Sequence, residues 1–405
     1  MSRSASDRPR RVVLSVEQAL SMPYATMRLA QLGWRVIRVE PTPAGGRTTP
    51  GDPNRYIGRP VAGEDRRSYF VAPNVGKEAI AIDLKTKSGQ SLLARLVREL
   101  AVDVFCTNTM LSRHDDLGIG YERLRAVKED LVWCAISAMG PRFPDVPGYD
   151  PVMQALCGYM DLTGAADAPP TQCGPPIIDL KAGDEAFAQV LLALLERGET
   201  GKGKRVDVSM AQAAVSWLLT SLPMLEMGSP PAELRRSGNE HRQFIPTNAY
   251  ATRDGFVYLA VGSDAQWARL AGEPMFAPLA DPAYATNEGR RAGKHELYAR
   301  LGAITREHAT SEVDAALTRA GIPHAPITPI ERVMDLPFVS SELLTTRAPD
   351  GRTIRLPPPA VPAPAGEARE VPFAPAYGQD TASVLSEAGL PGEEIAELYR
   401  ARVIA

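Results

Sequence analysis

Asp179 is the residue whose type and position could most directly do chemistry. It lies in the segment IIDLKAG (residues 177–183), immediately before an expected helix. Free amides at a helix N-terminus stabilise negative charge, so this carboxylate would stay ionised and could act as a nucleophile. The same position is the ordinary place for a capping aspartate, so the local pattern leaves both roles open.

The sulfur and imidazole side chains provide no comparable candidate. The histidines are scattered, and no serine lies in a Gly-x-Ser-x-Gly turn. The cysteines form no Cys-x-x-Cys pair and have no nearby histidines at metal-ligand spacing; they are Cys106, Cys134, Cys157 and Cys173. We therefore expect no metal, no disulfide framework and no serine hydrolase, and interpret the cysteines as small buried hydrophobic residues.

Two segments fail as nucleotide-binding motifs. GETGKGK (198–204) has the Gly-x4-Gly-Lys core of a phosphate loop, but Arg205 replaces the required Ser or Thr. The segment also follows an expected helix, whereas a phosphate loop follows a strand. After the first expected strand the chain reads EQALSMP, without the Gly-x-Gly-x-x-Gly of a dinucleotide site. We interpret GETGKGK as a surface turn and expect no nicotinamide or flavin cofactor.

The amino-acid composition limits the kinds of partner that the protein is expected to bind. The chain has 405 residues, a net charge of -3, 44% hydrophobic residues and 23% charged residues, which is typical of a soluble globular protein of about two domains. It lacks the clustered basic charge of a nucleic-acid binder. No apolar stretch reaches the length of about 18 residues that spans a membrane, and no apolar segment follows the basic start at residues 1–11. We expect a cytoplasmic protein with neither nucleic acid nor membrane as partner.

Apolar runs alternate with helical patterns in the first half of the chain. Strands are expected at 12–16, 35–40, 80–84, 102–107 and 132–138, with helices at 23–34, 88–100 and 121–127 between them. This alternation predicts an α/β fold with a parallel sheet covered on both faces. A further strand at 204–210 and one long apolar helix at 211–227 follow.

The second half is predicted to begin with a smaller α/β unit. Its hairpin, YATRDGFVYLAV (250–261), turns at Asp254-Gly255. Helices then run to about residue 327. The proline-rich stretch Leu356–Pro372 should be extended, and two short helices close the chain.

Several long segments carry a specific family resemblance. Between residues 148 and 210 the chain reads GYDPVMQALCGYMDLTG, PPTQCGPPIIDLKAG and LLALLERGETGKGKRVDVSM. Similar stretches near the ends are PYATMRLAQLGWRVIRVEP and GQDTASVLSEAGLPGEEIAEL. Together they resemble the class III CoA-transferases, which include formyl-CoA transferase and carnitine CoA-transferase and have the α-methylacyl-CoA racemases as relatives. The resemblance covers nearly the whole chain.

The resemblance implies that Asp179 is the nucleophile of an enzyme that moves coenzyme A from an acyl-CoA thioester, such as succinyl-CoA, to a free carboxylic acid. The reaction would pass through an aspartyl mixed anhydride and an aspartyl-CoA thioester. The thioester energy is conserved throughout, so no ATP, metal or permanently bound cofactor is implied, and coenzyme A enters as a substrate.

Further site residues follow from the same resemblance. Asn74, Lys77 and Asn108 occupy positions where related enzymes contact the coenzyme, and a lysine suits its 3'-phosphate. Leu20 stands where some formyl-CoA transferases have an active-site glutamine, and this apolar residue points to an acid larger than formate or oxalate. Gly183, four residues after Asp179, could allow close approach of substrate, although a glycine in an early helical turn can also be neutral.

The resemblance also implies an architecture and an assembly. A Rossmann-like large domain would contain residues 1–225 and 331–405, with a linker and small domain at 226–330 inserted between them. Two subunits would be interlocked as a homodimer, or paired with a homologous subunit as a heteromer.

Two other functions stay open at the level of sequence. An acyl-CoA racemase is one, but Tyr149 stands where racemases have their catalytic histidine, and a pKa near 10 suits tyrosine poorly to that role. The other is a non-catalytic CoA-binding subunit, which Asp179 and Gly183 argue against.

Overall fold

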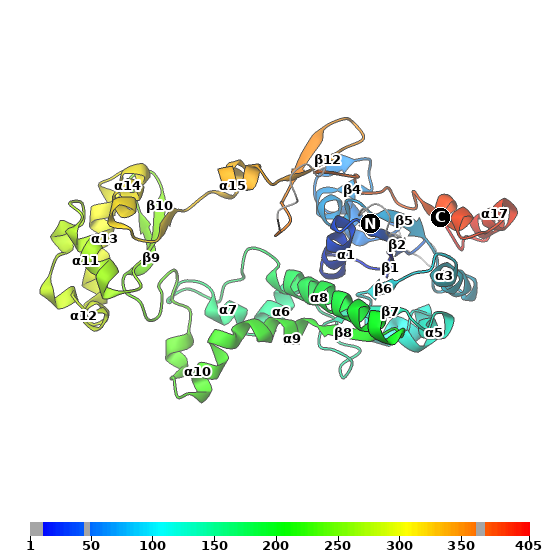
Figure 1. Ribbon diagram of the computed structural model, residues 1–405, viewed down its shortest axis with the longest axis horizontal. Coiled ribbons are helices and arrows are strands. Elements are labelled where there is room, and N and C mark those ends of the chain that lie inside the picture. The colour runs from blue at the N-terminus through cyan, green and yellow to red at the C-terminus, as the bar shows by residue number, and fades with distance from the viewer. Residues whose placement is uncertain (1–10, 44–48, 362–368) are drawn as a thin grey trace, which may run out of the picture. The chain divides into compact units, whose positions relative to one another are not determined.

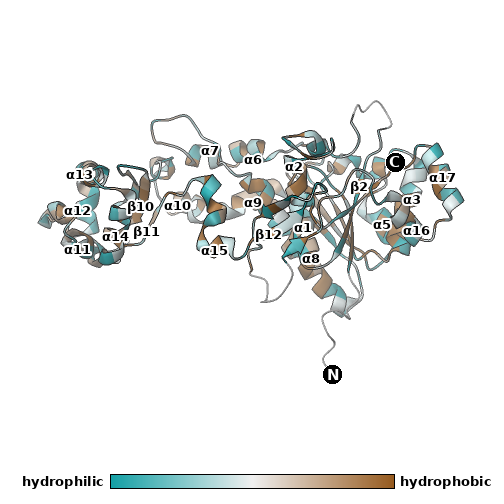
Figure 2. Ribbon diagram, turned by 90° about the horizontal axis from the view of Figure 1, so that it is seen from above, coloured by the Kyte–Doolittle hydropathy of each residue, from teal (hydrophilic) through white to brown (hydrophobic). Residues whose placement is uncertain are grey.

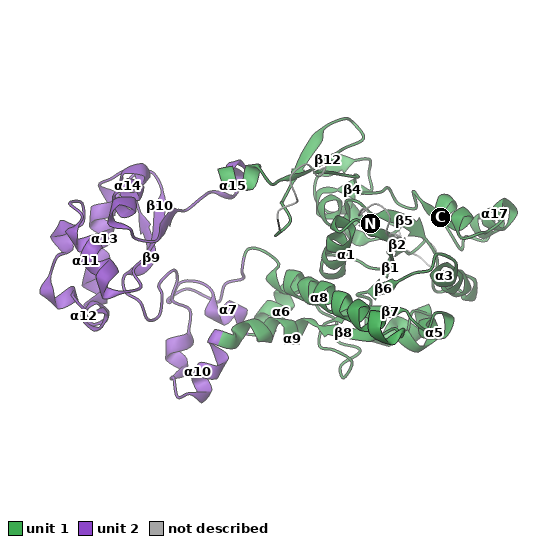
Figure 3. Cartoon of the chain, in the orientation of Figure 1, with its two compact units in different colours: residues 1–157, 174–219, 337–405 green, residues 158–173, 220–336 purple. Residues whose placement is uncertain are grey.

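A computed structural model describes residues 11–43, 49–361 and 369–405 of the chain. It contains two compact units, which Figure 3 colours separately. Unit 1 comprises residues 1–157, 174–219 and 337–405, and unit 2 comprises 158–173 and 220–336. The extreme N-terminus and residues 362–368 of the proline-rich stretch lie outside the described residues.

Unit 1 is built on a six-stranded sheet in the order β5-β2-β1-β6-β7-β8 (Figure 1). All neighbouring pairs are parallel, which confirms the predicted parallel α/β sheet. The order is that of the doubly wound dinucleotide-binding fold, although the glycine fingerprint of that fold is absent. The strands are β1 (Val12–Val16), β2 (Arg35–Glu40), β5 (Glu78–Ala81), β6 (Val104–Thr107), β7 (Val132–Ser137) and β8 (Arg205–Ser209).

Helices cover both faces of this sheet because its strands carry runs of buried apolar residues. On one face, α3 (Lys87–Glu99), α5 (Tyr121–Val127) and α16 (Thr381–Glu387) pack into one hydrophobic cluster with the strands. On the other, α1 (Ser21–Gln31) packs against the long helix α8 (Ile177–Thr200). The covering helices α3 and α17 (Gly392–Arg400) are amphipathic, with hydrophilic and hydrophobic residues on the same helix (Figure 2).

Shorter elements complete unit 1. A three-stranded sheet has the order β13-β12-β14, and β3 pairs with β4. The remaining elements are β3 (Pro60–Ala62), β4 (Arg66–Arg67), α2 (Ser68–Val71), α4 (His114–Leu117), α6 (Asp150–Leu156), α9 (Met210–Ser216), α15 (Pro337–Ser340), β12 (Leu344–Arg347), β13 (Thr353–Leu356) and β14 (Glu370–Val371).

The prediction of a single long helix at 211–227 is wrong. The chain forms α9, then a 3-10 turn at Trp217–Thr220, and then α10 (Leu222–Glu226). Leu218 has non-helical dihedral angles, and Pro223 has no N–H to continue an earlier helix. The break was not predicted because the apolar residues of 211–227 keep the spacing of a helix across it.

Unit 2 contains the predicted hairpin. Strands β9 (Thr247–Ala251) and β10 (Phe256–Ala260) are antiparallel, and β11 (His324–Pro326) pairs with β10. The helices of the unit are α7 (Tyr159–Leu162), α10, α11 (Asp264–Gly272), α12 (Asn287–Ala292), α13 (Lys294–Arg306) and α14 (Thr310–Ala320). In the described part of the chain, no helix combines the length and apolar character that a membrane span requires.

Candidate active site

The carboxyl ends of the central strands form the candidate site in unit 1. From β1 the chain adds β2 and β5 on one side, and it then adds β6, β7 and β8 on the other. Open parallel sheets bind ligands at such a switch point, because the loops that leave two adjacent strands diverge there. Two pockets lie at this edge. They share Gln18, Thr109 and Met110.

We name the first of these the Asp179 pocket, because Asp179 is its acidic residue. Its volume is about 180 Å³. The loops after β1, β6 and β7 and the starts of α8 and α9 form its walls. They contribute Gln18, Ala19, Ser21, Asn108, Thr109, Met110, Leu111, Ile136, Ser137, Ala138, Pro144, Val146, Pro147, Gly148, Tyr149, Asp179 and Met210.

Asp150 holds the start of α8 that carries Asp179. The helix begins at Ile177, two residues before Asp179, so the expectation that Asp179 directly precedes the helix is wrong. One Asp150 oxygen accepts hydrogen bonds from the amides of Ile178 (2.7 Å) and Asp179 (3.1 Å), and Gln154 donates to the other oxygen at 2.5 Å. The buried Asp150 carboxylate therefore satisfies the helix amides, and the side chain of Asp179 is left for the pocket.

The pKa of Asp179 is raised to about 7. Burial is the main cause, and the neighbouring Asp150 carboxylate adds to it. No ion pair between Asp179 and a cation occurs among the described residues. At neutral pH this carboxyl group is therefore divided between its protonated and ionised forms.

A constrained turn carries Gln18 between the two pockets. Asn108 fixes its backbone from β6, accepting from the Gln18 amide at 3.0 Å and donating to the Gln18 carbonyl at 2.7 Å. The next residue, Ala19, has a φ of 59°, which is unfavourable for a residue with a Cβ. The Asn108 contacts thus hold a strained turn in which the Gln18 side chain is exposed to both pockets.

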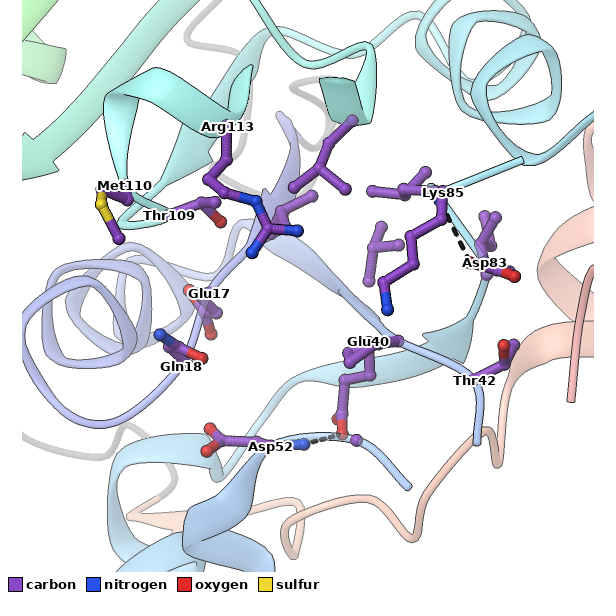
Figure 4. Close-up of a pocket in the computed structure, with 17 residues that line it drawn as sticks. Glu17, Gln18, Glu40, Thr42, Asp52, Asp83, Lys85, Thr109, Met110 and Arg113 are labelled. Carbon is purple, nitrogen blue, oxygen red and sulfur yellow. Dashed lines mark hydrogen bonds between the residues drawn. The ribbon is translucent and has the colours of Figure 1, made fainter. Parts of the chain in front are cut away.

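The second pocket, the strand-end pocket, has a volume of about 220 Å³ and lies over the ends of β1, β2, β5 and β6. Figure 4 shows the side chains of Lys85 and Arg113 extending into it. Neither cation forms an ion pair within the described residues. The acidic residues Glu40 and Asp52 of the walls lie below them, and the backbone N–H of Asp52 donates to the Glu40 carboxylate at 3.1 Å.

Beneath this pocket lies a set of buried charges, the charged network, comprising Glu17, Arg38, Glu40, Asp52, Arg55 and Lys77. Arg55 binds Glu40 at 2.6 Å, and Lys77 binds Glu17 at 2.7 Å. Burial opposes ionisation of both glutamates, but the adjacent cations outweigh it and lower the pKa of each. Burial also lowers the pKa of Lys77, to about 8, against the opposing effect of Glu17.

The predicted site residues occupy different places. Tyr149 and Asn108 line the Asp179 pocket with Asp179, whereas Leu20 lines neither pocket and its neighbours Ala19 and Ser21 do. Lys77 is buried, with hydrogen bonds from its ammonium to Glu17, the Pro23 carbonyl and Asn74, which is itself fully buried.

Gly183 lies at the contact between α8 and α1. A Cβ at this position would come within 2.7 Å of the Ser21 carbonyl oxygen and 2.8 Å of the Tyr24 ring. Its lack of a side chain therefore lets the two helices approach closely, which gives the glycine a packing role.

Sequence reasoning missed Asp150, Gln18, Lys85 and Arg113. Asp150 directly follows Tyr149 and precedes Pro151 at the start of α6, a signal for a helix start that says nothing of its contact with α8. Lys85 and Arg113 each follow an expected strand, where parallel-sheet ligands bind, and this placement could have identified them.

Metal coordination has no candidate in the described ranges. No group of three or more His, Cys, Asp or Glu side chains there is arranged to hold an ion. Cys106 and Cys134 are buried, as expected of small hydrophobic residues, whereas Cys157 and Cys173 are partly exposed.

Comparisons with known proteins identify the family. The model of CoA-transferase family III matches residues 11–381. The chain belongs to CoA-transferase family III. Succinyl-CoA:glutarate CoA-transferase of Mus musculus is 30% identical over 93% of this chain and 85% of its own length. The succinate–glutarate CoA-transferase of Agrobacterium fabrum is 32% identical over 84% of this chain and 86% of its own length.

Solved structures agree with this assignment. A crystal structure of a CaiB/BaiF family protein from Brucella suis has a TM-score of 0.81 at 28% identity, covering 93% of this chain and 98% of that chain. A Mycobacterium tuberculosis protein has a TM-score of 0.75 at 23% identity, which supports the fold alone. The protein is thus a CoA-transferase, which moves coenzyme A between acyl-CoA thioesters and carboxylic acids, and the predicted enzyme class is confirmed.

Proposed function

We propose that this CoA-transferase uses Asp179 as a covalent nucleophile, takes coenzyme A from succinyl-CoA and passes it to a small dicarboxylic acid. The observation that carries the proposal is the environment of Asp179. Its carboxyl group lines a pocket at the switch point of the sheet, without an ion-pair partner in the described residues, and burial raises its pKa to about 7. Carboxyl groups with shifted pKa values in such pockets are frequently catalytic.

The reaction is a sequence of acyl transfers. An Asp179 oxygen attacks the thioester carbonyl carbon, the C–S bond breaks, and a mixed anhydride and free CoA thiolate form. The thiolate attacks the aspartyl carbonyl carbon, which releases the donor acid and leaves an aspartyl-CoA thioester. The acceptor carboxylate then displaces the thiolate to form a second anhydride. Attack of the thiolate on the acceptor's carbonyl carbon gives the new acyl-CoA and restores Asp179.

The raised pKa suits Asp179 to this task. A more basic carboxylate is a stronger nucleophile, and at pH 7 about half of it is still ionised. Asp150 supports the chemistry in two ways, because its bonds to the α8 amides fix the Asp179 backbone and its charge raises the basicity of Asp179. Gln18, at the junction of the pockets, can donate a side-chain amide N–H to the thioester oxygen.

The coenzyme would lie across both pockets, with its thioester at Asp179 and its phosphates in the strand-end pocket. Lys85 and Arg113 are the cations directed into that pocket, and a guanidinium binds phosphate in two-point contact. Asn108 would act at the junction, where it fixes the Gln18 turn. Asn74 and Lys77 would act through the charged network below, since their polar groups already have buried partners.

The donor and acceptor are proposed from the relatives and from the pocket. The mouse and Agrobacterium relatives have names that include succinyl-CoA or succinate together with glutarate. Tyr149, 68% exposed at the rim of the Asp179 pocket, leaves room for an acid with an extended chain. We propose a homodimer as the assembly and the cytoplasm as the location.

An assay of coenzyme A exchange tests the proposal. The purified chain is incubated with succinyl-CoA and glutarate, and the appearance of glutaryl-CoA is followed by liquid chromatography. Arg113→Gln should raise the KM for succinyl-CoA about tenfold, since it removes one charge-assisted contact, with little change in the KM for glutarate. Absence of any acyl-CoA exchange with a panel of dicarboxylic acids would refute the proposed substrates.

A further inference from the structure

Unit 2 has a pocket of its own, rich in cationic side chains, which we name the basic pocket. Its volume is about 330 Å³. The segment 232–245, which leads into β9, forms one wall, and the helices α12 and α13 form the other. It is lined by Ala232, Glu233, Arg235, Arg236, Ser237, Glu240, His241, Arg242, Gln243, Ile245, Arg291 and Lys294.

Two residues of α12 hold the 241–245 part of this segment in place. The Asn287 side chain accepts from the Ile245 amide at 3.1 Å and donates to the Gln243 carbonyl at 2.9 Å. The fully buried Arg290 donates to the Ile245 carbonyl at 2.6 Å. The wall is therefore fixed by three hydrogen bonds from a helix, and a ligand would not have to order it on binding.

His241 is oriented by the same segment. Its Nδ1 accepts hydrogen bonds from the amides of Gln243 and Phe244, both at 3.1 Å, and its ring packs against Phe244. An Nδ1 that accepts two amides carries no proton, so the neutral ring has its proton on Nε2. His241 thus provides a fixed N–H donor at the pocket.

Positive charge exceeds negative charge in the basic pocket. Arg236 pairs with Asp161 at 3.1 Å, and Lys294 pairs with Glu240 at 3.1 Å. Arg235, Arg242 and Arg291 have no carboxylate within ion-pair distance among the residues that the structure describes. Within the described ranges, the hydrogen bonds of the Arg242 guanidinium go to the carbonyl oxygens of Leu234 and Arg235, at 3.1 and 3.4 Å.

Among the described residues, the three guanidinium groups without an ion pair outnumber the single carboxylate of the pocket that also lacks one, that of Glu233, and an anion would relieve the repulsion among them. Guanidinium groups match carboxylates in planar two-point contact. The cations come from opposite walls, Arg235 and Arg242 from the segment and Arg291 from α12, so a ligand with a carboxylate at each end can meet both walls.

We propose that the basic pocket binds a small dicarboxylic acid through Arg235, Arg242 and Arg291, with the Nε2–H of His241 as a further donor. Unit 2 then has a binding site of its own for dicarboxylic acids, whose existence does not depend on the proposed function.

Calorimetric titration of the full chain with glutarate tests the binding without requiring turnover. We expect saturable binding to the wild type and at least about tenfold weaker binding to Arg242→Gln/Arg291→Gln, because two charge-assisted contacts are lost. Arg332→Gln, an exposed arginine of unit 2 outside the pocket, should bind glutarate as the wild type does. Butyrate, with one carboxylate, should bind at least about tenfold more weakly than glutarate.

The titrations can overturn the inference, or separate its failure from a failure of the proposed function. Glutarate that does not saturate the wild type, or that binds the double variant equally well, means that the pocket is no dicarboxylate site. Inorganic phosphate that binds more tightly than glutarate and competes with it means that the cations serve a phosphate. If glutarate binding is lost in the double variant while the wild type exchanges no acyl-CoA, the site stands and the proposed function fails. Thermal melting of Arg242→Lys/Arg291→Lys, which keeps both charges, checks that folding is intact.

Discussion

Glu40 and Asp179 are both carboxylates of unit 1 held away from bulk water, and their pKa values move in opposite directions. Glu40 is fully buried, but Arg38 and Arg55 contact it, so its pKa falls despite the burial. At Asp179 burial is the main cause of a raised pKa, and the anion of Asp150 adds to it instead of opposing it, so the pKa rises to about 7. The sign of the neighbouring charges therefore decides whether the effect of burial on the pKa is outweighed or reinforced.

The opposite pKa shifts of Glu40 and Asp179 distinguish a carboxylate that stabilises the structure from one that is suited to react. A carboxylate enclosed by guanidinium groups is stable in its ionised form and is a poor nucleophile, because its electrons are engaged in strong hydrogen bonds. A carboxylate beside another carboxylate is held in a less stable state, which a protein retains where the group reacts. The charged network thus forms the floor of the strand-end pocket, and Asp179, in the Asp179 pocket, is the group that we propose to react.

The largest expected effect comes from removing the proposed nucleophile. Asp179→Asn should lower the rate of acyl-CoA exchange by roughly 10⁴-fold or more, as loss of a covalent nucleophile does in other enzymes. The rate is measured with succinyl-CoA and glutarate. Glu199→Gln, an exposed carboxylate on the same helix, is the matched control and should retain full activity.

Removing one charge of the charged network should lower the stability of the fold and is not aimed at the reacting group. Lys77→Met leaves Glu17 buried without its ammonium partner, so we expect the free energy of unfolding to fall by about 3–5 kcal/mol. Urea unfolding followed by circular dichroism measures this change. Lys202→Met, at an exposed turn, should change the free energy of unfolding little. A stable Lys77→Met variant would show that the network contributes little to folding.

In contrast to Lys77→Met, the substitution Asp179→Asn should increase the free energy of unfolding near neutral pH. The pKa of Asp179 in the folded chain lies above its ordinary value of 3.8, so the folded state holds more protons than the unfolded state between about pH 4 and 7. Stability of the wild type therefore falls as pH rises through this window. At pH 8 the asparagine variant should be more stable, by at most about 4 kcal/mol, since each pK unit is worth about 1.4 kcal/mol. At pH 4 the advantage should disappear.

Asp150 should contribute to the pH dependence of the reaction. The wild-type rate at limiting succinyl-CoA should rise with pH to a plateau, with a midpoint near 7, because ionised Asp179 is the reactive form. Asp150→Asn keeps an oxygen that can accept from the α8 amides but removes the charge, so the midpoint should move down by roughly one unit. Asp184→Asn, also on α8, is the control. An unchanged midpoint in Asp150→Asn would mean that Asp150 acts only as a helix cap.

Much of the fold followed from the sequence because its signals are local. Buried apolar runs marked the strands near residues 12–16, 35–40 and 132–137. The motif IIDLKAG pointed to Asp179, which lines a pocket at the carboxyl ends of these strands, and its role stays a prediction. The break of the expected helix at 211–227 was missed because Pro223 was the only strong signal against an otherwise helical pattern.

Contacts between distant segments were beyond sequence reasoning. The bond of Asp150 to the α8 amides joins residues 28 and 29 positions apart, and nothing in either segment specifies it. Lys77 gave no sign of its burial, since a lysine after a turn is usually exposed. The pKa shift of Asp179 therefore could be inferred only from the folded structure, which brings Asp150 next to it.

Covalent capture of the intermediate tests the central claim most directly. The purified chain is incubated with succinyl-CoA, and its intact mass is measured with and without hydroxylamine, which traps an activated carboxyl group. We predict a coenzyme A adduct, converted by hydroxylamine to a hydroxamate on Asp179, and no adduct on Asp179→Asn. An unmodified wild type that still exchanges acyl-CoA, or an adduct on another residue, would contradict Asp179 as the nucleophile.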